Sequence, residues 1–391
     1  MNTAELIEVL SRGEDSRHQF KADFTNADAL AAEIVAFSNT AGGRIFIGVS
    51  DDGHVIGLSA PDVARLNQLL SNTASQNVRP AVNPLTENVT HPNGTVLVAT
   101  IPGGVSKPYM DKIGTIWVKS GADKRRATSR EEIQRIFQQG GLVHADETLV
   151  DGMGVADVDV LFLDRYLEEQ TGETIEQRDL PLDRLLENMN LAKAGTLNLA
   201  GALLFAKRPE IRLPAFIAKA VAFPGDDIED EHYLDSRDLT GKINEIFEQG
   251  IRFLTGNTRT LQNGKSVNSL GEPEVPRIVW EELLANALVH RDYFITAPVR
   301  VLIFASRVEI ISPGHLPNHL SVENIKAGNS NIRNPILASF AAKLLPYRGL
   351  GSGILRALKA YPTIDLIDDR DGNLFKAIVR RRREPSSSVA E

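Results

Sequence analysis

The chain has 391 residues, which is enough for two or three domains with sizeable cores. It contains no cysteine, which excludes disulfides, thiolate metal sites and cysteine nucleophiles. The net charge of −8 argues against a simple basic nucleic-acid binder. Because no apolar run approaches the ~18 residues of a membrane span, we expect a cytoplasmic protein without membrane contact.

The first block, residues 1–140, alternates helix and strand signals and is almost neutral, with 14 basic against 15 acidic residues. Gly42 and Gly43 end the first expected helix, and Asp51-Asp52-Gly53 is a turn signal between two short strands. We therefore expect an α/β domain with helices over 28–37 and 130–138 and strands over 44–49, 55–58, 95–101 and 115–119.

The middle block, residues 141–264, begins within a linker over 140–154 and has 12 basic against 23 acidic residues, a net charge of −11. Its acidic run, Asp226 to Glu231, has no histidine or ligand spacing beside it and is typical of a solvated loop. We expect an acidic α/β connector with helices over 157–170, 180–189 and 242–254 and a strand over 216–223.

The last block has a net charge of +4 and follows a second linker over 262–276, which is rich in Gly, Asn, Ser and Pro. The pattern predicts a third domain over 265–380 and a flexible tail over 381–391, so the fold class is an α+β multidomain chain. The expected elements are helices over 277–290, 335–344 and 353–360 and strands over 299–304, 308–312 and 375–379.

Helix 277–290 carries Glu282, Asn286 and His290 four residues apart, so that all three share one face. Phosphoryl transfer from a nucleotide to water needs a group that activates the water and an oxygen ligand that holds Mg²⁺. Glu282 suits the first task and Asn286 the second, although a helix with a merely solvated polar face is the alternative. A turn with glycines at 349, 351 and 353 opens a later helix, and such a turn lets backbone N–H groups approach phosphates.

Together, the segments Asn286–Tyr293, Ser312–Pro317 and Arg348-Gly-x-Gly resemble the ATP-binding fold shared by gyrase, histidine kinases and MutL, known as the GHKL fold. The resemblance implies an α/β sandwich that binds ATP and Mg²⁺, with Glu282 as general base and Asn286 as magnesium ligand. Better-known members hold adenine with Asp-x-Gly-x-Gly, whereas Ser312-Pro-Gly stands here. The expected ATP-binding residues are Asn286, His290, Arg291, Asp292, Ser312, Gly314, Arg348, Gly349, Gly351 and Gly353.

Near the other end, Glu14 to Lys21, Ala36 to Gly43 and Ile47 to Gly57 resemble the AlbA-2 domain, also called the Schlafen-type domain. That family binds nucleic acid, and some members are nucleases that use two Glu, a Lys and an Asp around a metal. The resemblance places Glu14, Lys21 and Asp51 or Asp52 at these positions, with Gln19 in place of the second Glu. Because an amide brings no charge to a metal site, we expect binding without cleavage.

A basic run beside Trp117 is the expected contact with DNA or RNA, because such side chains neutralise phosphates and an exposed aromatic ring can stack on a base. A solvated hairpin with a core tryptophan is the alternative. The run consists of Lys119, Lys124, Arg125, Arg126 and Arg130.

The whole chain resembles bacterial ATP-binding transcriptional regulators. We expect a homodimer in which the nucleotide state of the last domain controls the first. Two alternatives remain open: a Schlafen-like metal-dependent ribonuclease gated by nucleotide, and an interaction scaffold without enzymatic activity. Weak ATPase activity is also left open.

Overall fold

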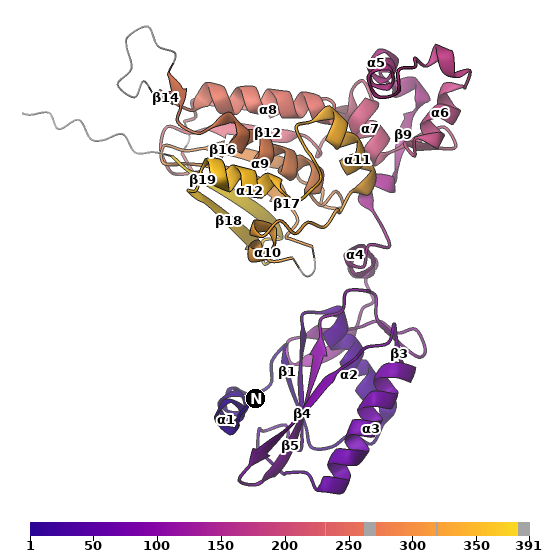
Figure 1. The fold of residues 1–391 in the computed structure, drawn as a ribbon, viewed down its shortest axis with the longest axis vertical. Coiled ribbons are helices and arrows are strands. Elements are labelled where there is room, and N and C mark those ends of the chain that lie inside the picture. The colour runs from indigo at the N-terminus through magenta and orange to yellow at the C-terminus, as the bar shows by residue number, and fades with distance from the viewer. Residues whose placement is uncertain (231, 262–270, 318–319, 382–391) are drawn as a thin grey trace, which may run out of the picture. The chain divides into compact units, whose positions relative to one another are not determined.

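The computed structural model describes residues 1–230, 232–261, 271–317 and 320–381. Most of the predicted tail, part of the second linker and Glu231 of the acidic run lie outside the described residues. The chain divides into two compact units, Met1–Val143 and His144–Glu391. Both units mix helices and sheets, as the predicted fold class requires (Figure 1).

Unit 1 is built on a four-stranded sheet in the order β1-β2-β5-β4, with β1 parallel to β2 and the other pairs antiparallel. Helices α2 and α3 cover one face and α1 covers the other (Figure 1). A hairpin, β7 and β8, packs beside α2, and β3 pairs with β6. The bounds are α1 Thr3–Arg12, β1 His18–Lys21, α2 Ala27–Asn39, β2 Gly42–Ile47, α3 Ala60–Gln76, β3 Val78–Arg79, β4 Leu85–His91, β5 Gly94–Pro102, β6 Met110–Asp111, β7 Trp117–Ser120, β8 Asp123–Arg126 and α4 Arg130–Gln139.

The strand expected over 55–58 is wrong. Only two single bridges form there, from Val49 to Val55 and from Leu58 to Thr95. Gly53 and Gly57 both adopt positive φ, and this conformation interrupts the extended backbone that a strand requires. Helix α2, by contrast, follows the predicted range closely because the Asn26 side chain caps its first turn.

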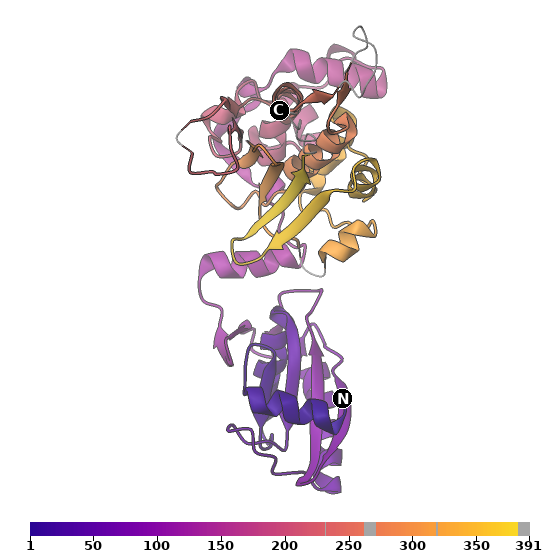
Figure 2. The same cartoon turned by 90° about the vertical axis from the view of Figure 1, so that its left-hand side faces the viewer.

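Unit 2 is built on a six-stranded sheet in the order β13-β12-β16-β17-β19-β18, in which only β12 and β16 are parallel neighbours. Helices α8, α9 and α12 lie along one face of this sheet, and Figure 2 shows the β18–β19 hairpin in yellow at its edge. The bounds of these elements are β12 Ala218–Ala222, β13 Asp235–Leu239, α8 Ile243–Asn257, α9 Arg277–His290, β16 Val299–Ile303, β17 Arg307–Pro313, α12 Gly353–Ala360, β18 Ile364–Asp369 and β19 Leu374–Arg380.

A smaller lobe, which opens unit 2, shares the same hydrophobic core and contains a three-stranded sheet in the order β10-β11-β9. The elements of this lobe are β9 Leu149–Gly154, α5 Val160–Thr171, α6 Leu182–Asn188, β10 Ala192–Lys193, β11 Thr196–Asn198 and α7 Leu199–Phe205. The remaining elements of unit 2 are β14 Thr260–Leu261, β15 Glu272–Pro273, α10 Val322–Lys326 and α11 Pro335–Leu344.

The sheet of unit 2 corrects the expected boundary at residue 264. Strand β12 comes from the acidic middle block, yet it pairs with β16 from the last block, with Ala218 opposite Val299. Core residues from both blocks form one cluster, which contains the side chains of Ala220, Phe247 and Trp280. Residues 141–264 are therefore not a separate connector, because their strands complete the sheet on which the C-terminal helices pack.

Candidate nucleotide pocket and the Schlafen-type cluster

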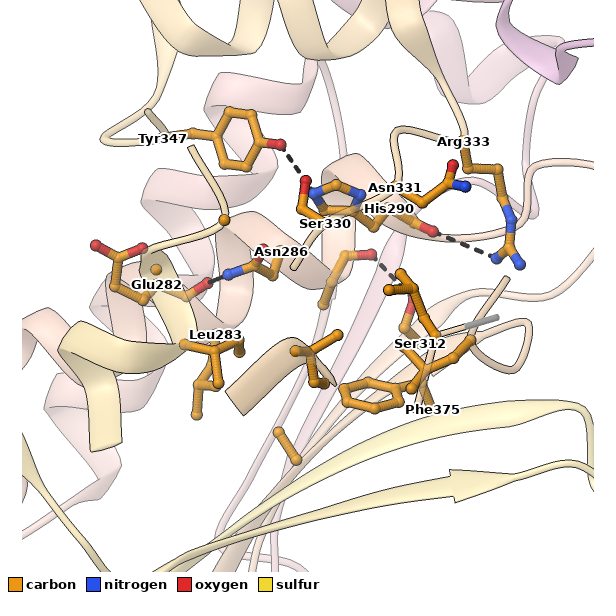
Figure 3. Close-up of a pocket in the computed structure, with 18 of the residues that line it drawn as sticks. Glu282, Leu283, Asn286, His290, Ser312, Ser330, Asn331, Arg333, Tyr347 and Phe375 are labelled. Atoms are coloured by element: carbon orange, nitrogen blue, oxygen red, sulfur yellow. Dashed lines mark hydrogen bonds between the residues drawn. The ribbon is translucent and has the colours of Figure 1, made fainter. Parts of the chain in front are cut away.

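A cavity of about 1030 Å³, partly open to solvent, lies between helix α9, the end of β17, the loop over 329–333 and the turn over 347–353. Figure 3 shows Glu282, Asn286 and His290 together at this cavity, with Tyr347 on one side of them and Ser312 and Phe375 on the other. The structure thus brings together the α9 residues and the glycine-rich turn, which are about sixty residues apart in sequence.

Helix α9 presents its polar residues to the cavity although the helix is otherwise buried on nearly every side. The Asn286 side-chain nitrogen donates to the backbone carbonyl of Glu282 at 2.6 Å. Within the described part of the chain, no hydrogen bond uses Asn286 Oδ1, so this oxygen is available to a ligand. An amide oxygen beside a carboxylate suits Mg²⁺ held jointly with phosphate oxygens, so the residues present fit the ion that the fold implies.

The glycine-rich turn lies closer to α9 than it could if Gly353 carried a side chain. A Cβ atom at Gly353 would lie 2.4 Å from Glu282 Oε2 and 3.1 Å from Asn286 Nδ2. Gly349 and Gly351 have φ values of +67° and +70°, and a Cβ at Gly351 would lie 2.1 Å from the Gly328 carbonyl. Among the residues that the structure describes, no side chain caps the start of α12, which leaves its first N–H groups open to an anion.

Three arginines line the cavity against one carboxylate. The arginines are Arg333, Arg348 and Arg356, the carboxylate is that of Glu282, and only Arg348 of the three arginines was predicted. Burial, with a smaller contribution from Arg333, lowers the pKa of His290 to about 4, so this ring is neutral at pH 7. The lining therefore has a net charge of +2 from these four charged residues, which favours a polyphosphate over an uncharged ligand.

His290 ties the helix to the turn. The Tyr347 hydroxyl lies 2.8 Å from Nε2 of its ring. Arg333 donates to the carbonyls of His290 and His315 at 3.4 and 2.9 Å. The predicted site residue His290 therefore lines the cavity and joins its walls, because its Nε2 already contacts Tyr347 and its carbonyl accepts from Arg333.

The end of the cavity near β17 is largely apolar. Ser312 and Gly314, both predicted, line it, and the Ser312 hydroxyl donates to the Ala287 carbonyl at 3.1 Å. An apolar slot with a single hydroxyl suits a flat heterocycle better than a charged group. The apolar side chains at this end are Leu283, Ile310, Leu316, Leu320, Phe375 and Ala377.

Arg291 and Asp292, which were predicted to bind ATP, do not line the cavity. The Arg291 guanidinium is buried between the rings of Phe216 and Tyr293, at 4.8 and 4.7 Å from their centroids, and donates to the carbonyls of residues 295 and 297. Asp292 accepts from the N–H of Phe294. Both side chains therefore help to shape the loop after α9 and lie outside the cavity lining.

In unit 1, the four residues predicted as a nuclease-like site do converge. Glu14 Oε1 accepts from the Gln19 amide at 2.5 Å and from the Phe20 N–H at 2.6 Å. The Lys21 ammonium lies 3.9 Å from Glu14 and 3.3 Å from Asp51. The cluster is thus held together by contacts that a metal would otherwise make.

Lys119 was predicted to contact nucleic acid, but its side chain is only 1% exposed. Its ammonium donates to Gln19 Oε1 at 2.7 Å and lies 4.0 Å from Glu33 Oε2. Lys124 donates to the other oxygen of Glu33 at 2.7 Å. Burial lowers the pKa of Lys119, while Glu33 and Glu14 oppose this change. Lys119 is therefore an interior residue, and buried Glu33, which was not predicted, belongs to the same cluster.

The divalent cation that nuclease members of the family imply does not fit this cluster. The carboxylates of Glu14, Glu33 and Asp51 each face a lysine, so a metal would have to displace an ammonium group. Within the described ranges, no group of three or more His, Asp or Glu side chains has the geometry to hold a metal ion. We derive no cleavage step from these residues.

The remaining basic residues differ in how accessible they are. Both terminal nitrogens of Arg125 donate to Glu132, at 2.8 and 2.6 Å. The Arg126 guanidinium lies 5.2 Å from the centroid of the partly buried Trp117 ring. Among the residues the structure describes, Arg126 and Arg130 form no ion pair, which leaves these two as the predicted contacts with phosphates.

The family model described as "Schlafen, AlbA_2" matches residues 14–128, and the one described as "Putative ATP-dependent DNA helicase recG C-terminal" matches residues 296–368. The chain therefore combines an AlbA-2 domain of the Schlafen type in unit 1 with an ATPase-like, RecG C-terminal-like domain in unit 2. The second match includes the glycine-rich turn and Ser312, whereas Glu282, Asn286 and His290 precede it.

Among solved structures, the DIP2311 protein from Corynebacterium diphtheriae is similar, with 20% identity over 97% of this chain and 80% of that chain and a TM-score of 0.46. The N-terminal domain of a RecG-related protein from Nitrosomonas europaea matches 33% of this chain and 91% of that chain, with 22% identity and a TM-score of 0.26. The comparison with curated proteins found no match. No helix in the described ranges has the length and hydropathy needed to cross a membrane.

Proposed function

We propose that unit 2 binds ATP together with Mg²⁺ in the cavity beside α9. The single observation that carries this proposal is the convergence of Glu282 and Asn286 with a glycine-rich helix start in a cavity that three arginines line. A helix N-terminus with close glycines and a positive lining suits phosphates, and the apolar end near Ser312 suits the base.

In this arrangement each residue has a distinct task. Asn286 Oδ1 would hold the magnesium ion, which neutralises phosphate charge when bound. Gly353 leaves room for that ion and the phosphates beside α9, and Gly349 and Gly351 shape the turn. Glu282 would act as the general base for weak ATP hydrolysis, a role that the position of its Oε2 beside Gly353 supports.

Asn286→Ala tests this assignment because it removes the oxygen without changing charge. By calorimetric titration of the full chain with ATP and Mg²⁺, we expect affinity to fall by about tenfold or more, in line with loss of a ligand in a charged site. The affinity for ATP without Mg²⁺ should change little. The exposed Asn188→Ala, at the end of α6, is the matched control. Unchanged binding in Asn286→Ala would refute the magnesium role.

We propose further that the nucleotide state of unit 2 controls nucleic-acid binding by unit 1 in a homodimeric, cytoplasmic transcriptional regulator. The presence of the two domain types in one chain supports this proposal. Arg126 and Arg130 are the side chains assigned to phosphate contact, because Lys119, Lys124 and Arg125 already face carbonyl, amide or carboxylate oxygens within unit 1.

Fluorescence anisotropy with labelled DNA and RNA oligonucleotides measures whether nucleotide changes the affinity of the chain for nucleic acid. We expect a non-hydrolysable ATP analogue to change the apparent Kd of the full chain by about fivefold or more, a coupling free energy of roughly 1 kcal/mol. Asn286→Ala should lose that effect while its Kd without nucleotide stays the same. Equal Kd values with and without the analogue, for every oligonucleotide tested, would count against the regulatory role.

A further inference from the structure

Arg356 occupies a distinctive place in the cavity. It lies on the first turn of α12, three residues after Gly353, and its side chain is 29% exposed. Its Nε and Nη2 both lie 2.6 Å from Glu282 Oε1, and its Nη1 donates to the Ser352 hydroxyl at 2.6 Å. Glu282 and Ser352 thus hold the guanidinium at the same end of the cavity as the glycine-rich turn.

These contacts leave part of the guanidinium unused. The group has five N–H donors, of which the Nε–H donates to Glu282 and one N–H of Nη1 donates to Ser352. Nη2 lies in ion-pair contact with the same Glu282 oxygen, so at least one donor remains on each of Nη1 and Nη2. Two parallel N–H donors match two oxygens of one phosphate group, which is why arginine is favoured where phosphate is recognised.

The other two arginines of the cavity are placed differently. Arg333 uses its terminal nitrogens on the carbonyls of His290 and His315, beyond the C-terminal end of α9. Arg348 is exposed and lies at the start of the turn. Arg356 is the one that adjoins both Glu282 and the start of α12, where the last phosphate of a nucleotide chain would lie.

We propose that Arg356 recognises the terminal phosphate of a nucleoside triphosphate and makes the site prefer a triphosphate to a diphosphate. This inference rests on the proposed function and adds a specificity residue to it. Glu282 then has a second task, since its Oε1 holds the guanidinium in place while Oε2 stays without a hydrogen bond among the described residues. The loss of Arg356 should affect the triphosphate far more than the diphosphate.

Calorimetric titration of the full chain with Mg²⁺ and ADP, ATP or its β,γ-imido analogue tests the proposal. We expect wild type to prefer the triphosphates and Arg356→Gln to lose about tenfold or more of that preference, as for loss of a bidentate charge-assisted contact. The ADP affinity should stay within about threefold. Arg356→Lys keeps the charge but not the fork and should be intermediate. Lys359→Gln, exposed on the same helix, matches the charge change and should behave as wild type.

Arg356→Gln leaves the buried Glu282 carboxylate unpaired, which can destabilise the fold by itself. The double variant Glu282→Gln/Arg356→Gln removes both charges. Comparing its ratio of ATP to ADP affinity with that of Glu282→Gln measures the effect of Arg356 when no carboxylate is left unpaired. If wild type binds no nucleotide, the proposed function and this inference both fail. If wild type binds nucleotide, the inference fails when the ratio of ATP to ADP affinity is the same in Arg356→Gln as in wild type and the same in the double variant as in Glu282→Gln. The proposed function stands in that case.

Discussion

Gly353→Ala should weaken ATP binding to unit 2 about a hundredfold. The added Cβ would lie 2.4 Å from Glu282 Oε2, and that carboxylate can move aside only by giving up its contact with Arg356. Either α12 moves away from α9 or the ion pair breaks, and in both cases the space assigned to phosphate is lost. We expect ATP affinity to fall about a hundredfold, equivalent to roughly 3 kcal/mol, by calorimetric titration.

Gly256→Ala is the matched control for this change. Gly256 lies near the end of α8, and a Cβ built there meets nothing within 4 Å. Its ATP affinity should equal that of wild type, and its melting temperature should stay the same or rise slightly because alanine restricts the unfolded chain. Retention of wild-type affinity by Gly353→Ala would show that phosphates do not approach this turn.

Acidification should destabilise unit 2 through His290. Burial lowers the pKa of His290 to about 4 from an ordinary value of 6.5. Between these values the unfolded chain binds a proton that the folded chain excludes, so stability is present above pH 6.5 and is lost as the pH falls towards 4. The full loss amounts to up to about 3 kcal/mol, or roughly 5–10 °C in melting temperature for a unit of this size.

His290→Gln should flatten this dependence, because glutamine can still meet Tyr347 and does not titrate. Melting temperatures measured between pH 7 and 4.5 give the comparison, with the exposed His232→Gln as the control that keeps the wild-type slope. Burial also lowers the pKa of His315, so the variant retains a smaller slope. Equal losses in wild type and His290→Gln would assign the acid sensitivity to other groups.

Much of the pocket was predictable because its chemistry follows local rules. The spacing of Glu282, Asn286 and His290 fixes a shared helical face, and alternate glycines at 349, 351 and 353 allow a close backbone approach. Arg333 and Arg356 were missed because an isolated arginine in a sequence does not show which carboxylate or carbonyl it will meet. The only local hint was that Arg356 follows Gly353 by nearly one helical turn.

The predictions that differ from the structure have a different physical origin. Arg291 and Lys119 look like ligand contacts in sequence because cations are usually exposed. Tertiary packing placed Arg291 against Phe216 and Lys119 against Gln19, contacts that join segments far apart in the chain. The prediction of a separate connector over 141–264 was wrong for the same reason. The charge of a segment reflects its exposed surface and does not show which distant strand the segment will pair with.

The strand pairing of β12 with β16 determines which pieces of this protein can exist alone. A fragment that began at residue 265 would leave one edge of β16 with unpaired backbone groups and would uncover the side of α9 that packs on α8. The residues that line the cavity all lie after 280, yet the compact unit that holds them begins at His144. If the ATPase-like domain were exchanged between related chains, the acidic residues 141–264 would therefore have to be transferred with it.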